Sequence, residues 1–491
     1  MNTIKCPNCN ALLSHPADAK TKKCEFCGFE TYIKPKTVAQ PRVNHPAPTP
    51  RQPASAQKSG PGCLIIVLVL FVLAGAFLAF AFSTGLFDTG LPATTGLNET
   101  ITLEGRTETI PGVAIKATGV NTKVFIRDCN IKADKLLVAT QPNIEIEIVN
   151  SRIETSDNTF ELPLNPKIRI SENSEIVSTQ GTVFKGGQNV EFTLTNSRII
   201  GDKYAFEMGN NGTFVLEGKS LIRGGKSAIK GEHNIHVEML DGSAIESDGT
   251  VLDLQYNGRL KMENAVLKGD VGVEADSNFE LTMVSGKLLG ENIGLSLATN
   301  GKVKMEGGVI AGKTAIEGND NSITVEMEGG EIIGTDVGIL GNQTLKLEME
   351  SGKIRGQTAV RSLGDFGGND VTIEGGAIEG VQFGIQFEKR GTIKLTGGTV
   401  TGQTAIQVPE YSEIKISGGT INGAKVGIEG ADRLTITGQS GTIKGGEYAI
   451  VKGSYGSLPE KTVTIEGDIK EKKTDRPHIP AGFYVNGKRV M

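Results

Sequence analysis

The most regular feature of the chain is an alternation of apolar and polar residues in short runs, repeated at a nearly constant interval between residues 302 and 423. Each repeat contains an alternating run, a Gly-Gly or Ser-Gly pair and a second short run, as in KVKMEGGVIAG and LKLEMESGKIRG. The pairs end at Gly308, Gly330, Gly352, Gly376, Gly398 and Gly419. Their spacings are 22, 22, 24, 22 and 21 residues, and such a fixed period predicts units that stack on copies of themselves.

The period of the alternation predicts strands rather than helices. Val303 and Met305 alternate with Lys302 and Lys304, which places one pair inside and the other in solvent. A third run follows each pair, in which a small residue precedes an aliphatic one, as in Ala315-Ile316. Three strands and three turns per repeat predict a parallel β-solenoid, and the general rule for parallel crossovers makes it right-handed. Glycine suits the turns because tight corners often require positive φ.

The same period continues towards the N-terminus, where Asn or Asp stands at the turn positions that are Gly in the later repeats. Asn and Asp can replace Gly there because they also tolerate the left-handed conformation. We therefore predict a solenoid over residues 101–470, with roughly sixteen or seventeen coils. Charge and proline interrupt the period after residue 470. Asn486-Gly487 between apolar runs predicts a hairpin, so we expect residues 471–491 to cap the last coil.

The period, the small-residue–aliphatic strand and the Asn or Gly-Gly turns resemble those of right-handed parallel β-helix proteins of the pectate-lyase-like type. The resemblance implies the fold, and it implies that polysaccharide-cleaving members carry acidic residues with Arg, Lys or His along one strand face. His233 and His236 are the histidines of the solenoid region, and they could share one face of an extended run. A catalytic or metal-binding role needs acidic partners, and the sequence does not show which acidic residues would lie near the histidines in the fold. The alternative is that both are simply exposed histidines.

The first 34 residues contain two Cys-x-x-Cys pairs, which predict a zinc ribbon. Each pair directs two thiolates at one ion, so Cys6, Cys9, Cys24 and Cys27 complete a tetrahedral Zn²⁺ site. The segment resembles the small zinc ribbons at the N-termini of many bacterial proteins. Four protein ligands close the site, which indicates a structural ion. Two disulfides are the alternative, and a cytoplasmic location would disfavour them.

A Pro/Ala-rich linker at residues 35–62 leads into an uncharged apolar stretch at residues 63–82. As a helix, this stretch is about 30 Å long, the thickness of the hydrocarbon core of a bilayer. The flank before it carries Arg and Lys, and the flank after it begins with Asp88. The positive-inside rule then places the N-terminus in the cytoplasm and the solenoid outside, in the periplasm or at the cell surface. Residues 83–100 form a spacer.

Charge and composition narrow the classes of partner and activity that fit this chain. Residues 1–62 hold nine Lys/Arg and three Asp/Glu, about +6, so the net charge of -5 leaves about -11 for the remainder. The basic residues lack interleaved aromatic side chains, which disfavours nucleic acid as a partner. The chain has no Trp, and aromatic side chains usually build sugar platforms. We therefore predict a non-enzymatic surface protein that binds or spaces a polysaccharide or protein; a tethered polysaccharide lyase or hydrolase is the alternative.

One column of acidic residues suggests a second cation. Glu306, Glu328, Glu350 and Glu374 each precede a turn pair. If the repeats stack in register, neighbouring carboxylates lie about 4.8 Å apart and repel each other. Calcium could offset this repulsion, and so could the nearby Lys304, Lys346 and Lys353.

Overall fold

The structure is a computed structural model. It describes residues 96–364, 368–459 and 463–472, together with the backbone of short strands outside these ranges. The chain divides into two compact units, residues 1–86 and 87–491. The first unit contains two antiparallel hairpins, β1 (Asn2–Lys5) with β2 (Leu12–His15) and β3 (Thr21–Lys23) with β4 (Glu30–Tyr32).

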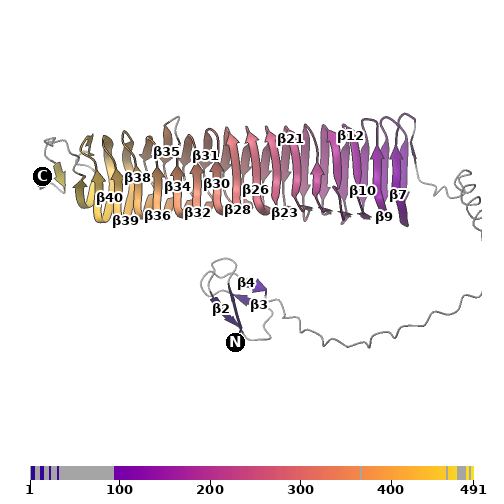
Figure 1. Ribbon diagram of the computed structural model, residues 1–491, viewed down its shortest axis with the longest axis horizontal. Helices are drawn as coiled ribbons and strands as arrows, with labels where there is room; N and C mark the ends of the chain where they lie inside the picture. The colour runs from indigo at the N-terminus through magenta and orange to yellow at the C-terminus, as the bar shows by residue number, and fades with distance from the viewer. Residues whose placement is uncertain are drawn as a thin grey trace, which may run out of the picture. The chain divides into compact units, whose positions relative to one another are not determined.

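The second unit is a β-solenoid whose coils stack along one axis (Figure 1). Its strands form one 38-stranded sheet in which each strand pairs in parallel with the strands of the coils before and after it. For example, β10 (Glu145–Val149) lies between β8 (Lys123–Arg127) and β13 (Lys167–Ser171). About 17 coils of about 22 residues follow one another, and the described part of the chain contains no helix. The predicted parallel solenoid is therefore confirmed.

In the first two coils, the second and third runs form one strand each, β7 (Thr107–Ala117) and β9 (Asn130–Ala139). The coils from β10 to β24 (Thr250–Tyr256) have three separate strands, as predicted. One such coil consists of β10, β11 (Arg152–Thr155) and β12 (Phe160–Leu164). From β26 (Ala265–Ser277) onward, the second and third strands merge into one long strand whose register shifts at a corner glycine. The chain folds back closely there: a Cβ atom on Gly380 would lie 1.7 Å from the carbonyl oxygen of Phe383.

The core consists of columns of apolar side chains, one from each coil. The second inward position of the strand before the turn pair is methionine in six successive coils, and all six are at most 1% exposed. They are Met239, Met262, Met283, Met305, Met327 and Met349. Nearer the N-terminus, Phe184 stacks on Phe160 and Phe206 with ring centroids 4.5 and 4.6 Å apart. The methionine side chains are unbranched and flexible, so they can fill a column whose width changes slightly from coil to coil.

The turn pairs have the conformation that the glycines predicted. The second Gly of each pair from Gly308 to Gly419 has φ between 70° and 91°. In earlier coils the same turn uses Asn or Asp with positive φ, including Asn150 at 47° and Asn173 at 60°. Both residue types adopt the left-handed conformation at lower cost than other side chains do.

A ladder of asparagine side chains runs along another corner, and the sequence analysis did not anticipate it. Its members are Asn98, Asn121, Asn143, Asn165, Asn189, Asn211, Asn234, Asn257, Asn278 and Asn300, all with φ between 54° and 63°. Each amide donates to the Oδ1 atom of the previous member over 2.7–3.2 Å. The ladder joins each coil to the next by a side-chain hydrogen bond over the N-terminal half of the solenoid.

Asn211 tests what the ladder contributes. Its Nδ2 donates to Asn189 and its Oδ1 accepts from Asn234, both over 2.8 Å. We expect Asn211→Ala to lower the free energy of unfolding by about 1–3 kcal/mol, because both bonds and the tolerance for positive φ are lost. Asn211→Gly loses the bonds but keeps the backbone conformation, so we expect a smaller loss. Urea denaturation followed by circular dichroism measures both, and an Asn211→Ala variant as stable as the natural chain would contradict the prediction.

The two ends of the solenoid differ. At the start, β5 (Ala93–Thr94) pairs with the end of β7 (Thr107–Ala117), so pairing begins within the predicted spacer. At the other end, Lys452 is only 3% exposed, and its Nζ atom lies 3.2 Å from Glu471. Beyond it, β43 (Phe483–Val485) and β44 (Lys488–Val490) form an antiparallel hairpin, as Asn486-Gly487 predicted. The side chains of this hairpin lie outside the described residues, so its role as a cap stays a prediction.

Within the described ranges, no helix is long and apolar enough to cross a membrane. The predicted span at residues 63–82 and the linker before it lie outside those ranges.

Candidate functional site

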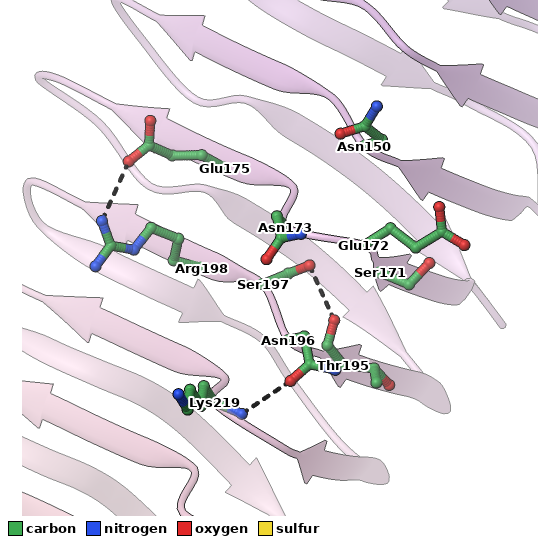
Figure 2. A pocket seen from close by; sticks show the side chains of 10 residues that line it. All are labelled: Asn150, Ser171, Glu172, Asn173, Glu175, Thr195, Asn196, Ser197, Arg198 and Lys219. Carbon is green, nitrogen blue, oxygen red and sulfur yellow. Dashed lines mark hydrogen bonds and ion pairs between the residues drawn. The ribbon is translucent and has the colours of Figure 1, made fainter.

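A polar hollow of about 920 Å³ opens on the turns of four successive coils (Figure 2). Its lining side chains are amides, hydroxyls and charged groups. They belong to Asn150, Ser171, Glu172, Asn173, Glu175, Thr195, Asn196, Ser197, Arg198 and Lys219. The hollow was not predicted from the sequence.

Differences in turn length create this hollow. Two residues separate β16 (Val190–Thr195) from β17 (Arg198–Gly201). The turns on either side are one residue longer: three residues separate β13 from β14 (Glu175–Ser178), and three separate β19 (Gly212–Glu217) from β20 (Leu221–Gly224). The strands keep their register, so the extra residues protrude from the longer turns. The short turn thus forms the floor between two walls.

Hydrogen bonds hold the floor in place. Ser197 is 2% exposed, and its Oγ donates to the carbonyl oxygen of Thr195 over 3.0 Å. The same Oγ accepts the backbone N–H of Ser174 from the previous coil over 3.1 Å. On the other side, the Oδ1 of Asn196 accepts the backbone N–H of Lys219 over 3.1 Å. Buried hydroxyls bonded in this way give a binding surface that needs little rearrangement.

The walls carry opposite charges. Glu172 stands in the turn on one side of the floor and Lys219 in the turn on the other side (Figure 2). Both are exposed, and neither forms an ion pair within the part of the chain that the structure describes. Between them, Arg198 faces Glu175 at 3.7 Å.

This arrangement contrasts with the strand faces, where opposite charges pair from coil to coil. Lys123 lies 2.9 Å from Glu145, and Lys167 lies 2.8 Å from Glu191. The hydrogen bond from Lys123 lowers the pKa of Glu145 despite partial burial. The hollow therefore offers two charges that find no ion-pair partner among the described residues, together with amides and hydroxyls that can donate and accept hydrogen bonds.

The structure separates the two histidines, which the sequence analysis placed on one face of an extended run. His233 ends β21 (Ser227–His233) and stacks on Tyr256 with ring centroids 4.8 Å apart. His236 belongs to the next strand, β22 (Ile235–Met239). Asn234 turns the chain between them with φ of 55°. The expectation of a shared face was wrong because a ladder asparagine, not an extended run, joins the two residues.

His236 lies instead in a shallow groove of about 430 Å³ with Arg259 and Glu280 from the next two coils. An adjoining hollow of about 320 Å³ adds Glu238 and Lys261. Partial burial, and then the charge of Arg259, lower the pKa of His236, which favours the neutral form of its imidazole.

These are the acidic partners that the sequence analysis could not place. Both already have cationic partners: Glu238 lies 2.7 Å from Lys261, and Glu280 lies 3.5 Å from Arg259. His236 and Arg259 are 23 residues apart, close to the repeat length, and this spacing could have predicted that they occupy equivalent positions in neighbouring coils.

In the column of Glu306, Glu328, Glu350 and Glu374, a lysine offsets the repulsion between the first two carboxylates. The Nζ of Lys304 lies 3.3 Å from Glu306 and 3.0 Å from Glu328. The hydrogen bonds of Glu328 and then Glu306 raise the pKa of Lys304. Lys346 and Lys353 pair elsewhere, with Glu348 at 2.9 Å and Glu379 at 4.0 Å. Across the described ranges, no group of three or more His, Cys, Asp or Glu side chains could hold a metal ion.

The predicted zinc ligands lie outside the described residues. Cys6 and Cys9 fall between the paired strands β1 and β2 in the sequence, and Cys24 and Cys27 fall between β3 and β4. Among the described residues, the one cysteine is Cys129, which is buried and forms no disulfide.

Comparisons with protein-family models, with curated proteins and with solved structures found no match.

Proposed function

We propose that this chain is a non-enzymatic surface protein, anchored in a membrane, whose right-handed β-helix binds or spaces extracytoplasmic glycan or protein partners. The polar hollow around Asn196 carries the proposal. It combines a hydrogen-bonded floor, a lining of amides and hydroxyls, and two exposed charges that form no ion pair with any residue the structure describes. Such a surface is suited to recognition, since it offers directional hydrogen bonds without a nucleophile paired to a base.

The solenoid supports a spacing role as well. Each coil adds about 4.8 Å along the axis, so about 17 coils extend about 80 Å. Nine amide–amide bonds join the ladder asparagines, and ion pairs join neighbouring coils along the strand faces. A scaffold joined at every coil resists bending, so it can hold a binding site at a defined distance from its anchor.

The anchor rests on the sequence. Residues 63–82 are the proposed single span, with the zinc ribbon in the cytoplasm and the solenoid in the periplasm or at the cell surface. In this arrangement the basic segment of about +6 stays on the cytoplasmic side, and the acidic remainder of about -11 lies outside.

Zinc binding by the ribbon has a direct test. We expect the purified full-length protein to contain one Zn²⁺ ion per chain by elemental analysis, held by Cys6, Cys9, Cys24 and Cys27. Cys24→Ser leaves three thiolates, so we expect the bound zinc to fall below half of that value. The solenoid should keep its circular dichroism signal. Cys129→Ser is the matched control, because this cysteine lies in the solenoid core. Two disulfides and no zinc in the purified protein would contradict the prediction.

A membrane-tethered polysaccharide lyase or hydrolase is the second candidate function, and the groove of His236 favours it. A neutral imidazole beside Arg259 could accept a proton, and Glu238 and Glu280 lie in the same region. Against it, both carboxylates are engaged by cations in the resting structure.

One experiment separates the two functions. The full-length protein is applied to an array of acidic and neutral polysaccharides and proteins, with and without calcium, and each captured glycan is assayed for chain cleavage. Binding without cleavage is the expected result. Cleavage that His236→Gln abolishes would establish the enzyme instead. No capture of any glycan or protein would leave the spacing role alone.

A further inference from the structure

We propose that the hollow around Asn196 binds a short zwitterionic peptide in an extended conformation, with its ammonium group at Glu172 and its carboxylate at Lys219. This inference rests on the proposed function and names the ligand class of that site. The ligand is about three residues long and lies along the solenoid axis.

The charges set the polarity of the ligand. Glu172 and Lys219 are the groups of opposite sign on the two walls, and neither forms an ion pair among the residues that the structure describes. Arg198, the other cation in the lining, already faces Glu175. A purely anionic ligand would meet Glu172, and a purely cationic ligand would meet Lys219. A ligand with one charge of each sign at its ends satisfies both walls.

The spacing of the walls sets the length. Glu172 and Lys219 belong to turns two coils apart, and the turn of Asn196 lies between them. Coils are about 4.8 Å apart, so the two walls are separated by about 10 Å. An extended chain spans up to about 3.5 Å per residue, so the termini of a tripeptide are also about 10 Å apart. A dipeptide is too short to reach both walls in an extended conformation.

The floor favours peptide groups. Between the walls, the floor presents the Nδ2 of Asn196 and the hydroxyl of Thr195, and the amide of Asn173 stands in the turn of Glu172. Side-chain amides provide a donor and an acceptor close together, which matches the N–H and C=O of a peptide unit. The described lining contains no aromatic ring on which a sugar could stack.

Isothermal titration calorimetry of the full-length protein with triglycine tests the proposal. Triglycine is zwitterionic and has no side chains, so its binding reports the two termini and the peptide groups alone. We expect saturable binding at one site per chain. N-acetyl-triglycine amide, which lacks both charges, should bind at least about tenfold more weakly, and diglycine should also bind more weakly.

Charge variants then locate the site. We expect Glu172→Gln and Lys219→Gln each to weaken triglycine binding about threefold, the size of an exposed ion pair. The exchange Glu172→Lys with Lys219→Glu restores both charges in reverse order, so it should restore binding of triglycine in the opposite direction. Glu263→Gln with Lys268→Gln removes two exposed charges away from the hollow and should leave binding unchanged.

Three results would overturn the proposal: no heat of binding at millimolar triglycine, equal binding of triglycine and its uncharged analogue, or unchanged binding in the Glu172→Gln, Lys219→Gln double variant. The outcome for the proposed function is separate. If triglycine fails these tests while the natural chain still captures array components, only the ligand assigned to the hollow is wrong and the proposed function stands.

Discussion

Phe206→Ala should lower the free energy of unfolding by about 3–5 kcal/mol, the usual cost of removing a fully buried phenyl ring. Phe206 is 1% exposed and lies at the centre of an aromatic cluster. Its ring centroid lies 4.6 Å from that of Phe184, 4.7 Å from Phe192 and 4.9 Å from Phe214. These rings belong to three neighbouring coils, so the substitution leaves a cavity across two coil interfaces.

Urea denaturation of the full-length protein measures this loss. Phe125→Ala is the matched control, because Phe125 points outward and is only partly buried. We expect the control to lose about 1 kcal/mol or less. In a solenoid, each coil contacts mainly its neighbours, so a weak interface can unfold separately from the rest. A Phe206→Ala variant with an unchanged unfolding curve would show that the aromatic cluster contributes nothing to stability.

Gly380→Ala should also destabilise the solenoid strongly, by about 2–4 kcal/mol, although it adds only one methyl group. The new Cβ would lie 1.7 Å from the carbonyl oxygen of Phe383 and 2.2 Å from its carbonyl carbon. These are backbone atoms at a corner of the coil, so no side-chain rotation relieves the contact. The corner must open, and the strand register between this coil and its neighbours is disturbed.

Gly368→Ala is the matched control for this substitution. A Cβ at Gly368 meets no atom within 4 Å, so we expect a change within about 0.5 kcal/mol. Thermal unfolding of both variants under the same conditions gives the comparison. Equal melting temperatures for Gly380→Ala and the natural chain would contradict the close approach at the corner.

Asn211 and Cys24 contribute to different parts of the molecule. The asparagine ladder concerns how neighbouring coils are held together, and the zinc ligands concern the N-terminal unit. Asn211 tests the exterior of the solenoid, Phe206 its core, Gly380 a corner of one coil and Cys24 the N-terminal unit. The triglycine titration concerns binding alone, because Glu172 and Lys219 are exposed and their removal creates no cavity.

The repeat itself could be predicted from the sequence, because it depends on local properties of the chain. Period-two alternation around Val303 and Met305 specifies which side chains face inward, and both are fully buried. Glycine at positions such as Gly330 indicates positive φ, and its φ is 82°. Stacking identical units then follows from the need to bury one face of each coil.

The candidate binding surface could not be predicted, because it arises from differences between neighbouring coils, and local sequence patterns do not contain these differences. One extra residue in the turn of Glu172 is a small irregularity in the sequence, yet beside the shorter turn of Asn196 it becomes the wall of a hollow. His233 and His236 are close in the chain but belong to different strands, because Asn234 turns the backbone between them.

The sequence alone thus determined the period, the inward faces and the turn conformations, since each rests on the intrinsic geometry of a few consecutive residues. Only the tertiary structure decided which residues of different coils meet: the amide ladder, the phenylalanine stack, the ion pairs and the lining of the hollow. The physical reason is register. Strand pairing holds equivalent positions of neighbouring coils side by side. A residue added to a turn protrudes from that turn and does not shift the strands. Its effect on the surface is therefore visible only when neighbouring coils are compared in the folded structure.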